Sequence, residues 1–220
     1  MPPPRVASVN LVHAIVADPR GDVGRTAIDK RPVDGAVQIQ ALGPVGDTVL
    51  DRRHHGGRDQ AVYAYALEDL AAWSLELGRD LSPGTFGENL TTEGLDVTGA
   101  VIGERWQVAG ADGSDPVVLE VTAPRIPCAT FQGWMGEPHW VRRFTERGAP
   151  GAYLRVTAQG RIRAGAPVEV VHRPEHGVTI GEVFVLRHAD PVRLRALLDH
   201  GRDLHGPLAD AVAARLARTG

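Results

Sequence analysis

The chain has 220 residues, of which 43% are hydrophobic and 23% charged, as is typical of a soluble globular protein. Its formal net charge of −3 gives no electrostatic case for binding nucleic acid. No apolar stretch approaches the roughly 20 residues of a membrane span, and residues 1–5 lack the apolar run of a signal peptide. Because Cys128 is the sole cysteine, it cannot form an internal disulfide, and we expect a reducing cytoplasm.

The first three quarters of the sequence predict mainly β-structure. Residues 5–17 are rich in short and β-branched side chains, and residues 33–42 alternate in hydrophobicity with a period of two. Further strands are predicted at residues 61–66, 100–108, 117–122, 153–157 and 168–172. Many short strands separated by turns favour a mainly β fold with helices, built as a barrel or closed sheet.

A helix is predicted over residues 67–77, because leucines recur there at helical spacing and Gly78 suits the position after a helix end. A second helix is expected over residues 139–145. Around His139, the aromatic side chains of Trp134, Trp140 and Phe144 could line a substrate mouth or pack that helix on the core.

The pattern changes near Pro174. Three short helices are predicted after it, over residues 179–187, 190–200 and 208–218. Asp190 can cap the middle helix, and the proline that follows suits the first helical position. The sequence thus predicts a main domain over residues 1–173 and a small three-helix extension over residues 178–220.

Cys128 follows two prolines that flank an arginine, in the segment formed by residues 123–128. Proline fixes φ and lacks a donor, so we expect a stiff loop that presents Arg125 with the thiol, rather than a helix interior or a central strand. The thiol alone could be a buried filler, a nucleophile or a soft metal ligand.

A loop with two adjacent glycines is formed by residues 54–57. Gly56 and Gly57 allow positive φ and close backbone approach, which suits an anion-binding nest, although a simple turn would also use them. His54 and His55 are adjacent on the chain, so they would not easily share one metal ion.

Residues 86–92 combine the permissive Gly87 with polar side chains around one leucine. Their amides, hydroxyls and backbone N–H groups could hold a phosphate or pterin edge. An edge strand with a glycine bulge is the alternative. A further cluster with Gly151, Tyr153 and Arg155 is interpreted as a turn entering a strand. Neither a Cys-x-x-Cys pair, a P-loop, a dinucleotide fingerprint nor a Gly-x-Ser-x-Gly elbow occurs in the sequence.

Taken together, these segments resemble the MOSC family, the domain shared with the C-terminal part of molybdenum cofactor sulfurases, and within it the stand-alone YiiM-type branch. The matching runs are residues 26–33, 46–47, 54–57, 59–65, 86–92, 124–128 and 151–155. The resemblance implies a mixed β-barrel that binds a molybdopterin cofactor, with the cysteine as the protein's ligand to molybdenum. Related members reduce N-hydroxylated bases and amidoximes, and others have been proposed as sulfur carriers.

The resemblance implies that Cys128 is both the catalytic residue and the metal ligand. The candidate cofactor-binding residues are Lys30, His54, His55, Gly56, Gly57, Gly87, Glu88, Asn89, Leu90, Thr91, Arg125 and Arg155. A thiolate suits a soft transition metal, and Arg125 can lower the thiol pKa or pair with phosphate. Pyridoxal phosphate is disfavoured, because a Schiff base would have to use Lys30, the only lysine.

The expected activity is reduction of a small N-hydroxylated molecule, with electrons from a separate flavoprotein or ferredoxin-type protein. One alternative is a sulfur carrier or sulfurtransferase with a persulfide on Cys128, and another is a module that only binds the cofactor.

Overall fold

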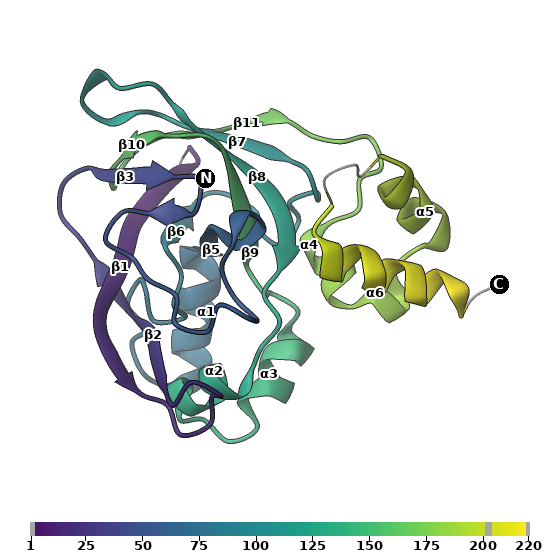
Figure 1. Ribbon diagram of the computed structural model, residues 1–220, viewed down its shortest axis with the longest axis horizontal. Helices are drawn as coiled ribbons and strands as arrows, with labels where there is room; N and C mark the ends of the chain where they lie inside the picture. Colours follow the sequence, from purple (N-terminus) through teal and green to yellow (C-terminus); the bar gives the residue numbers. More distant parts are fainter. Residues whose placement is uncertain (1–2, 201–203, 219–220) are drawn as a thin grey trace.

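The computed structural model describes residues 3–200 and 204–218, which form a mixed assembly of sheets and helices (Figure 1). An eight-stranded sheet has the order β11-β7-β8-β9-β5-β6-β1-β2. Its strands are β1 (Arg5–Ala17), β2 (Arg25–Pro32), β5 (Val62–Ala66), β6 (Leu90–Glu93), β7 (Arg105–Val108), β8 (Val117–Pro124), β9 (Ala152–Ala158) and β11 (Val168–His172). A three-stranded sheet has the order β10-β3-β4, formed by β10 (Gly160–Ile162), β3 (Val37–Gln40) and β4 (Gly43–Pro44).

The eight-stranded sheet is mixed but not closed. Strands β5 and β6 run parallel, whereas the other neighbouring pairs are antiparallel. The start of β1 bonds to the segment before β11, with Val6 N donating to the Ala166 carbonyl at 2.9 Å. Even so, β2 and β11 end the order of described strands, so the expected closed barrel is not confirmed.

Strand β2 and helix α2 (Ala129–Met135) are among the elements that were not expected from the sequence. Strand β2 carries Asp29, Lys30 and Arg31 in succession, so its sequence shows no apolar alternation. It forms a strand because it pairs with β1. Helix α2 begins directly after Cys128 without a side-chain cap. The other helices of the first 173 residues are α1 (Leu67–Leu77) and α3 (Trp140–Arg147), with one-turn 3-10 helices η1 (Arg58–Gln60) and η2 (Ala111–Gly113).

Two local expectations are wrong. Strand β8 extends to Pro124 and lies between β7 and β9, so residues 123–124 end a central strand. A proline is tolerated there because it ends the strand, where only one donor is lost. Strand β6 lies between β5 and β1, so the alternative of an edge strand for residues 86–92 does not hold.

The helices of the first part pack through aromatic side chains. Trp73, Phe86, Phe131, Trp140 and Phe144 are all fully buried in one cluster, and the rings of Trp73 and Trp140 have centroids 4.5 Å apart. Such aromatic pairs each add about 0.5–1.5 kcal/mol beyond their burial. Trp140 and Phe144 therefore pack α3 on the core, as one of the two alternatives predicted. The same cluster fixes α2 through Phe131, and with it Cys128, the residue before the first turn of α2.

The tail contains helices α4 (Ile180–Phe184), α5 (Pro191–His200) and α6 (Gly206–Ala217), with the 3-10 helix η3 (Leu186–His188), to one side of the sheet (Figure 1). Helix α4 is shorter than predicted, and Thr179 with Glu182 forms a capping box at its start. Leu194, Leu197 and Val212 belong to the same buried cluster as the sheet's core, so the division into two domains stays a prediction.

No helix within residues 3–200 and 204–218 combines the length and apolar character needed to cross a membrane.

Candidate functional site

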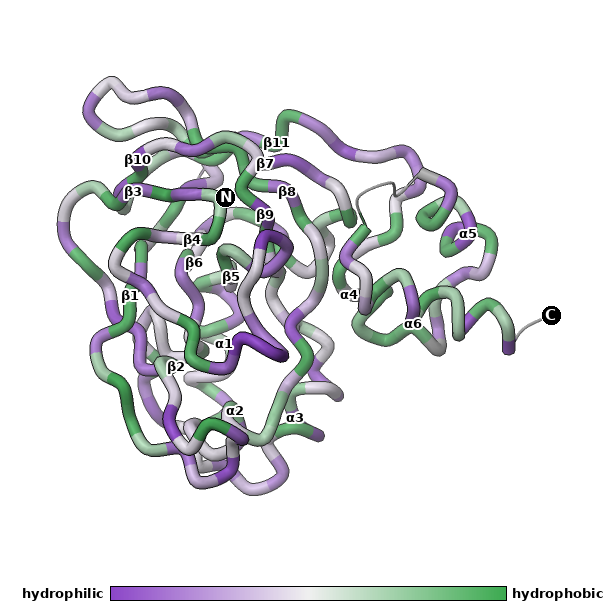
Figure 2. Tube along the Cα trace, in the orientation of Figure 1, coloured by the Kyte–Doolittle hydropathy of each residue, from purple (hydrophilic) through white to green (hydrophobic). Residues whose placement is uncertain are grey.

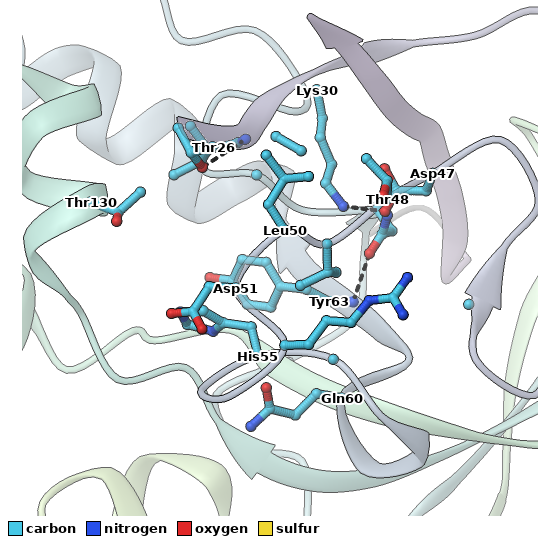
Figure 3. A pocket seen from close by; sticks show the side chains of 18 of the residues that line it. Thr26, Lys30, Asp47, Thr48, Leu50, Asp51, His55, Gln60, Tyr63 and Thr130 are labelled. Carbon is cyan, nitrogen blue, oxygen red and sulfur yellow. Dashed lines mark hydrogen bonds and ion pairs between the residues drawn. The ribbon is translucent and has the colours of Figure 1, made fainter. Parts of the chain in front are cut away.

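A cavity of about 690 Å³ is lined by strands β2 and β5, by the loop that follows β4, and by the segment before α2. Its volume falls within the roughly 300–1,000 Å³ of small-molecule and cofactor pockets. Figure 3 shows the labelled side chains around it: Thr26 and Lys30 from β2, Asp47, Thr48, Leu50, Asp51 and His55 from the loop, Gln60 from η1, Tyr63 from β5 and Thr130 from α2. Segments far apart in the sequence thus meet at one site.

Cys128 lines this cavity and is half-buried. It is the residue before the first turn of α2, in extended conformation. Burial raises the pKa of its thiol, but a hydrogen bond from His55, the backbone N–H of Phe131 and the positive charge of Arg125 outweigh burial and lower the pKa to about 7. A large share of the thiol is therefore ionised at neutral pH, as a metal ligand or nucleophile requires.

Arg125 lies on the wall next to the thiol and is only 6% exposed. Its guanidinium carbon is 3.8 Å from the ring centroid of Phe131 and 5.1 Å from that of Tyr63. It donates to the backbone carbonyl of Phe86, while its Nε has no hydrogen-bond partner in the described chain. A buried cation without a carboxylate is costly unless an anionic group comes to it, so this wall is suited to an anion.

Lys30 faces the cavity from β2 but is already paired. Its ammonium lies 2.5 Å from Asp47 Oδ2, and the two side chains are 9% and 7% exposed. Asp47 also accepts from Asn89 Nδ2 at 2.8 Å and from Val12 N at 3.0 Å. Burial lowers the pKa of Lys30, and its pairing with Asp47 opposes that shift. This network holds β2, the loop and the residue before β6 together.

Gly56 and Gly57 line the cavity with φ of 81° and 79°, which are left-handed values that favour glycine. A side-chain carbon at Gly57 would meet nothing within 4 Å, so the conformation rather than crowding calls for glycine there. His55 lines the cavity, whereas His54 is outside its lining and bonds through Nδ1 to Asp51 at 2.9 Å. The two histidines thus have different surroundings.

Of the residues that follow Phe86, some line the cavity and others are buried in the fold. Gly87 and Asn89 line the cavity. Glu88 is fully buried, and its carboxylate accepts from the N–H groups of Gly84 at 2.5 Å and Phe86 at 3.0 Å and from the Thr91 hydroxyl at 2.9 Å. Burial raises the pKa of Glu88, although these hydrogen bonds oppose the rise. Glu88 therefore holds the loop in place rather than facing the cavity.

Leu90 lies in the hydrophobic core of the sheet, and Thr91 is buried against Glu88 and Asn10. Arg155 is outside the cavity lining and pairs with Asp59 at 2.8 Å and Glu120 at 3.3 Å. The structure does not bring these candidates to the cavity, and a direct binding role for them stays a prediction.

Sequence reasoning missed several lining residues. Asp47 lies in the matching run of residues 46–47, but its pairing with Lys30 depends on contacts 17 positions apart. Tyr63 was read only as part of a strand, yet its ring forms a wall, 5.2 Å from the ring of Tyr153, and its hydroxyl donates to the Pro150 carbonyl at 2.8 Å. Side-chain alternation along β5 could have predicted which way Tyr63 points, but not that its ring contacts that of Tyr153.

Within the described residues, no group of three or more His, Cys, Asp or Glu side chains lies close enough to hold a metal ion. Cys128 could supply a single soft ligand to a metal whose other ligands come from a bound cofactor. The low thiol pKa, the free Nε of Arg125 and the two-glycine turn fit such an anionic group. Fold and site together define a mixed sheet-and-helix protein in which a cysteine with a lowered pKa and a buried arginine line one cavity.

Comparison with known proteins places the chain in a family. The MOSC domain matches residues 51–169, more than half of the chain. YflK of Bacillus subtilis (strain 168) is 33% identical over 192 residues, which cover 87% of this chain and 84% of YflK. YiiM of Escherichia coli (strain K12) is 31% identical over 167 residues, which cover 73% of this chain and 70% of YiiM. The chain therefore belongs to the MOSC domain family.

Two further likenesses bear on the site. A protein named Reductase from Gibberella moniliformis (strain M3125 / FGSC 7600) is 30% identical over 152 residues, covering 68% of this chain but 26% of that protein. The crystal structure of YiiM from Geobacillus stearothermophilus has a TM-score of 0.76 at 25% identity, covering 97% of this chain and all of that one. The chain is thus similar to the YiiM proteins in both sequence and fold.

Proposed function

We propose that this chain is a molybdenum-cofactor-binding oxidoreductase that reduces N-hydroxylated compounds of the hydroxylaminopurine or amidoxime type, with Cys128 as the ligand to molybdenum. MOSC domains are associated with the molybdenum cofactor, and a relative that matches 68% of this chain is named a reductase. The observation that carries the proposal is the half-buried Cys128 thiol, with its pKa lowered to about 7, beside the buried Arg125.

The residues of the cavity would divide the work of holding the cofactor. Cys128 supplies the thiolate, and Arg125 offers its free Nε to a phosphate. Gly56 and Gly57 offer backbone N–H groups at a turn with positive φ. Asn89 has its side-chain oxygen and nitrogen bound within the fold, so it shapes the wall.

The reaction breaks one N–O bond: R–NHOH, two electrons and two protons give R–NH2 and water. When bound, the molybdenum cofactor supplies the two-electron chemistry that this bond cleavage needs. His55 lies beside the thiol in the cavity and donates a hydrogen bond that favours the thiolate. The electrons would come from a separate flavoprotein or ferredoxin-type protein.

A second candidate function rests on the same thiol. A half-buried cysteine with a pKa near 7 could also carry a persulfide and hand its sulfur on. A persulfide carrier has no use for a cavity of about 690 Å³ with a buried, unpaired guanidinium, so we favour the reductase.

The test uses protein purified from a host that makes molybdenum cofactor. With reduced methyl viologen as electron donor, the wild type should reduce benzamidoxime and an N-hydroxylated purine, and Cys128→Ala should not. Thr157→Val, at an exposed position on β9, is the control for a single substitution. Wild-type turnover by Cys128→Ala would rule out the proposed ligand. A gain of one sulfur on Cys128 after incubation with a cysteine desulfurase, without turnover, would favour the carrier.

A further inference from the structure

The arginines of residues 3–173 fall into two groups by their partners. Most form ion pairs, as Arg105 does with Glu120 and Arg147 does with Glu76. The arginines that no described carboxylate pairs with are Arg20, Arg25, Arg52, Arg53, Arg58 and Arg125. Arg125 is buried in the cavity wall, and the others are exposed.

Two of the exposed members line the cavity and three are next to lining residues in the sequence, and we call these five the mouth arginines. Arg25 and Arg52 line the cavity, and Arg53 follows directly. Arg20 and Arg58 are next in sequence to the lining residues Gly21 and Gly57. Positive charge is therefore concentrated there on a chain whose net charge is −3.

The carboxylates of the same region do not cancel this charge. Asp47 forms an ion pair with Lys30, and Asp51 lies 2.9 Å from His54 Nδ1. Asp18 is buried and accepts from the Thr130 hydroxyl at 2.5 Å. Asp22 is the exposed carboxylate among the described lining residues, and it forms no ion pair with a described side chain. The mouth arginines together with Lys30 and Arg125 outnumber these carboxylates, so a positive excess remains.

Apolar side chains stand between these charges. Val23, Leu42 and Val45 line the cavity and are 48%, 72% and 50% exposed. Ile126, two positions before the thiol, is 62% exposed. In Figure 2 the loop that follows β4 passes between hydrophobic and strongly hydrophilic colour as it crosses in front of β5 and α1. Arginine is enriched at protein interfaces, and exposed aliphatic side chains beside it supply apolar area that a protein partner can bury.

We propose that the mouth arginines and the aliphatic side chains between them are the docking surface for an acidic electron-donor protein, a flavodoxin-like or ferredoxin-like carrier. This inference rests on the proposed reductase function, which needs two electrons per turnover from outside the chain. Charge complementarity steers such encounters and raises association rates, and it is screened by salt. Docking at the mouth brings the donor to the cavity that Cys128 lines.

The experiment compares a charge-reversed mouth with a matched control. The test variant carries Arg20→Glu, Arg53→Glu and Arg58→Glu, none of which lines the cavity. The control carries Arg161→Glu, Arg163→Glu and Arg195→Glu, exposed arginines elsewhere with the same change of charge. Each protein is assayed with reduced methyl viologen, with a purified acidic ferredoxin and with a flavodoxin, at low and high salt. Calorimetric binding of the oxidised ferredoxin and of a DNA duplex is measured in parallel.

The proposal expects viologen-driven turnover to be equal in all three proteins. Turnover per donor concentration with the acidic protein should fall by about tenfold or more in the test variant at low salt, and the difference should vanish at high salt. Viologen activity with no response to either carrier, or carriers that serve the test variant as well as the wild type, would overturn it. Tighter binding of the duplex than of the ferredoxin would overturn it in favour of nucleic acid. If viologen drives no turnover, the proposed function fails, and the ferredoxin-binding measurement still decides whether the surface docks an acidic protein.

Discussion

The two buried cationic side chains that line the cavity have opposite surroundings. Lys30, on the β2 wall, is bound by Asp47, which also accepts from Asn89 and from the backbone of Val12. Arg125, on the wall next to Cys128, has aromatic faces and one carbonyl around it and a free Nε. On the β2 wall the cation is paired with a carboxylate of the same chain. On the wall next to Cys128 the cation has no carboxylate partner and is available to an anionic ligand.

This difference separates stability from binding. A charge satisfied by its own chain contributes to the folded state, and removing its partner leaves an uncompensated ion. A buried cation without such a partner is a cost to the empty protein, and that cost is offset when an anionic ligand arrives. Both side chains were predicted to bind the cofactor, and we propose that Arg125 has that part.

The largest effect is expected when the buried ion pair between Lys30 and Asp47 is broken. Asp47→Ala leaves Lys30 buried without its partner, so the free energy of unfolding in urea should fall by about 3–5 kcal/mol. Lys30→Met combined with Asp47→Leu should recover much of the loss, because both charges are then gone. Glu146→Ala is the control, since its ion pair with Arg142 on α3 is exposed, and it should cost at most about 1 kcal/mol. An Asp47→Ala protein as stable as the wild type would contradict the contrast.

The next effect tests the unsatisfied wall. Arg125→Met keeps an apolar stem against Phe131 but removes the charge, so pterin content after gel filtration should drop, with affinity weakened by about tenfold or more. The unfolding free energy of the empty protein should change less than in Asp47→Ala. Arg161→Met is the matched control at an exposed site. Full retention of pterin by Arg125→Met would show that this wall does not hold the anionic part of the cofactor.

A smaller effect concerns the thiol between the two walls. Its alkylation by iodoacetamide, followed against pH in cofactor-free protein, should have a midpoint near the lowered pKa of about 7. His55 and Arg125 both favour the thiolate, so His55→Gln should move the midpoint upward, toward the ordinary value of about 8.5. His54→Gln should leave it in place, because that ring bonds to Asp51 instead. A wild-type midpoint at the ordinary value would contradict the contacts around Cys128.

The sequence predicted what depends on local pattern. Helix α1 has leucines at helical spacing and a glycine with φ of 64° at its end, and β1 and β5 are built from β-branched and small apolar residues. Strand β2 was not predicted, because its charged residues become compatible with a strand only through the pairing with β1 and the ion pair between Lys30 and Asp47. The open end of the sheet at β2 is likewise set by tertiary pairing.

For the site, the juxtaposition of Arg125 and Cys128 could be foreseen, because they are three positions apart on a stiff segment. The burial of Glu88 and Thr91 and the outward pairing of Arg155 could not, because they depend on which side of a loop or strand meets a neighbour. Which arginines lack a carboxylate partner was also not apparent from a sequence with net negative charge.

The central claim is that Cys128 binds molybdenum, and X-ray absorption at the molybdenum edge tests it most directly. Wild-type protein and Cys128→Ser, both purified from a host that makes the cofactor, would be compared by the number of sulfur atoms around the metal. The account predicts one sulfur fewer in Cys128→Ser, with a lighter oxygen neighbour or a lost metal in its place. The same sulfur count in both proteins at equal molybdenum content would contradict it.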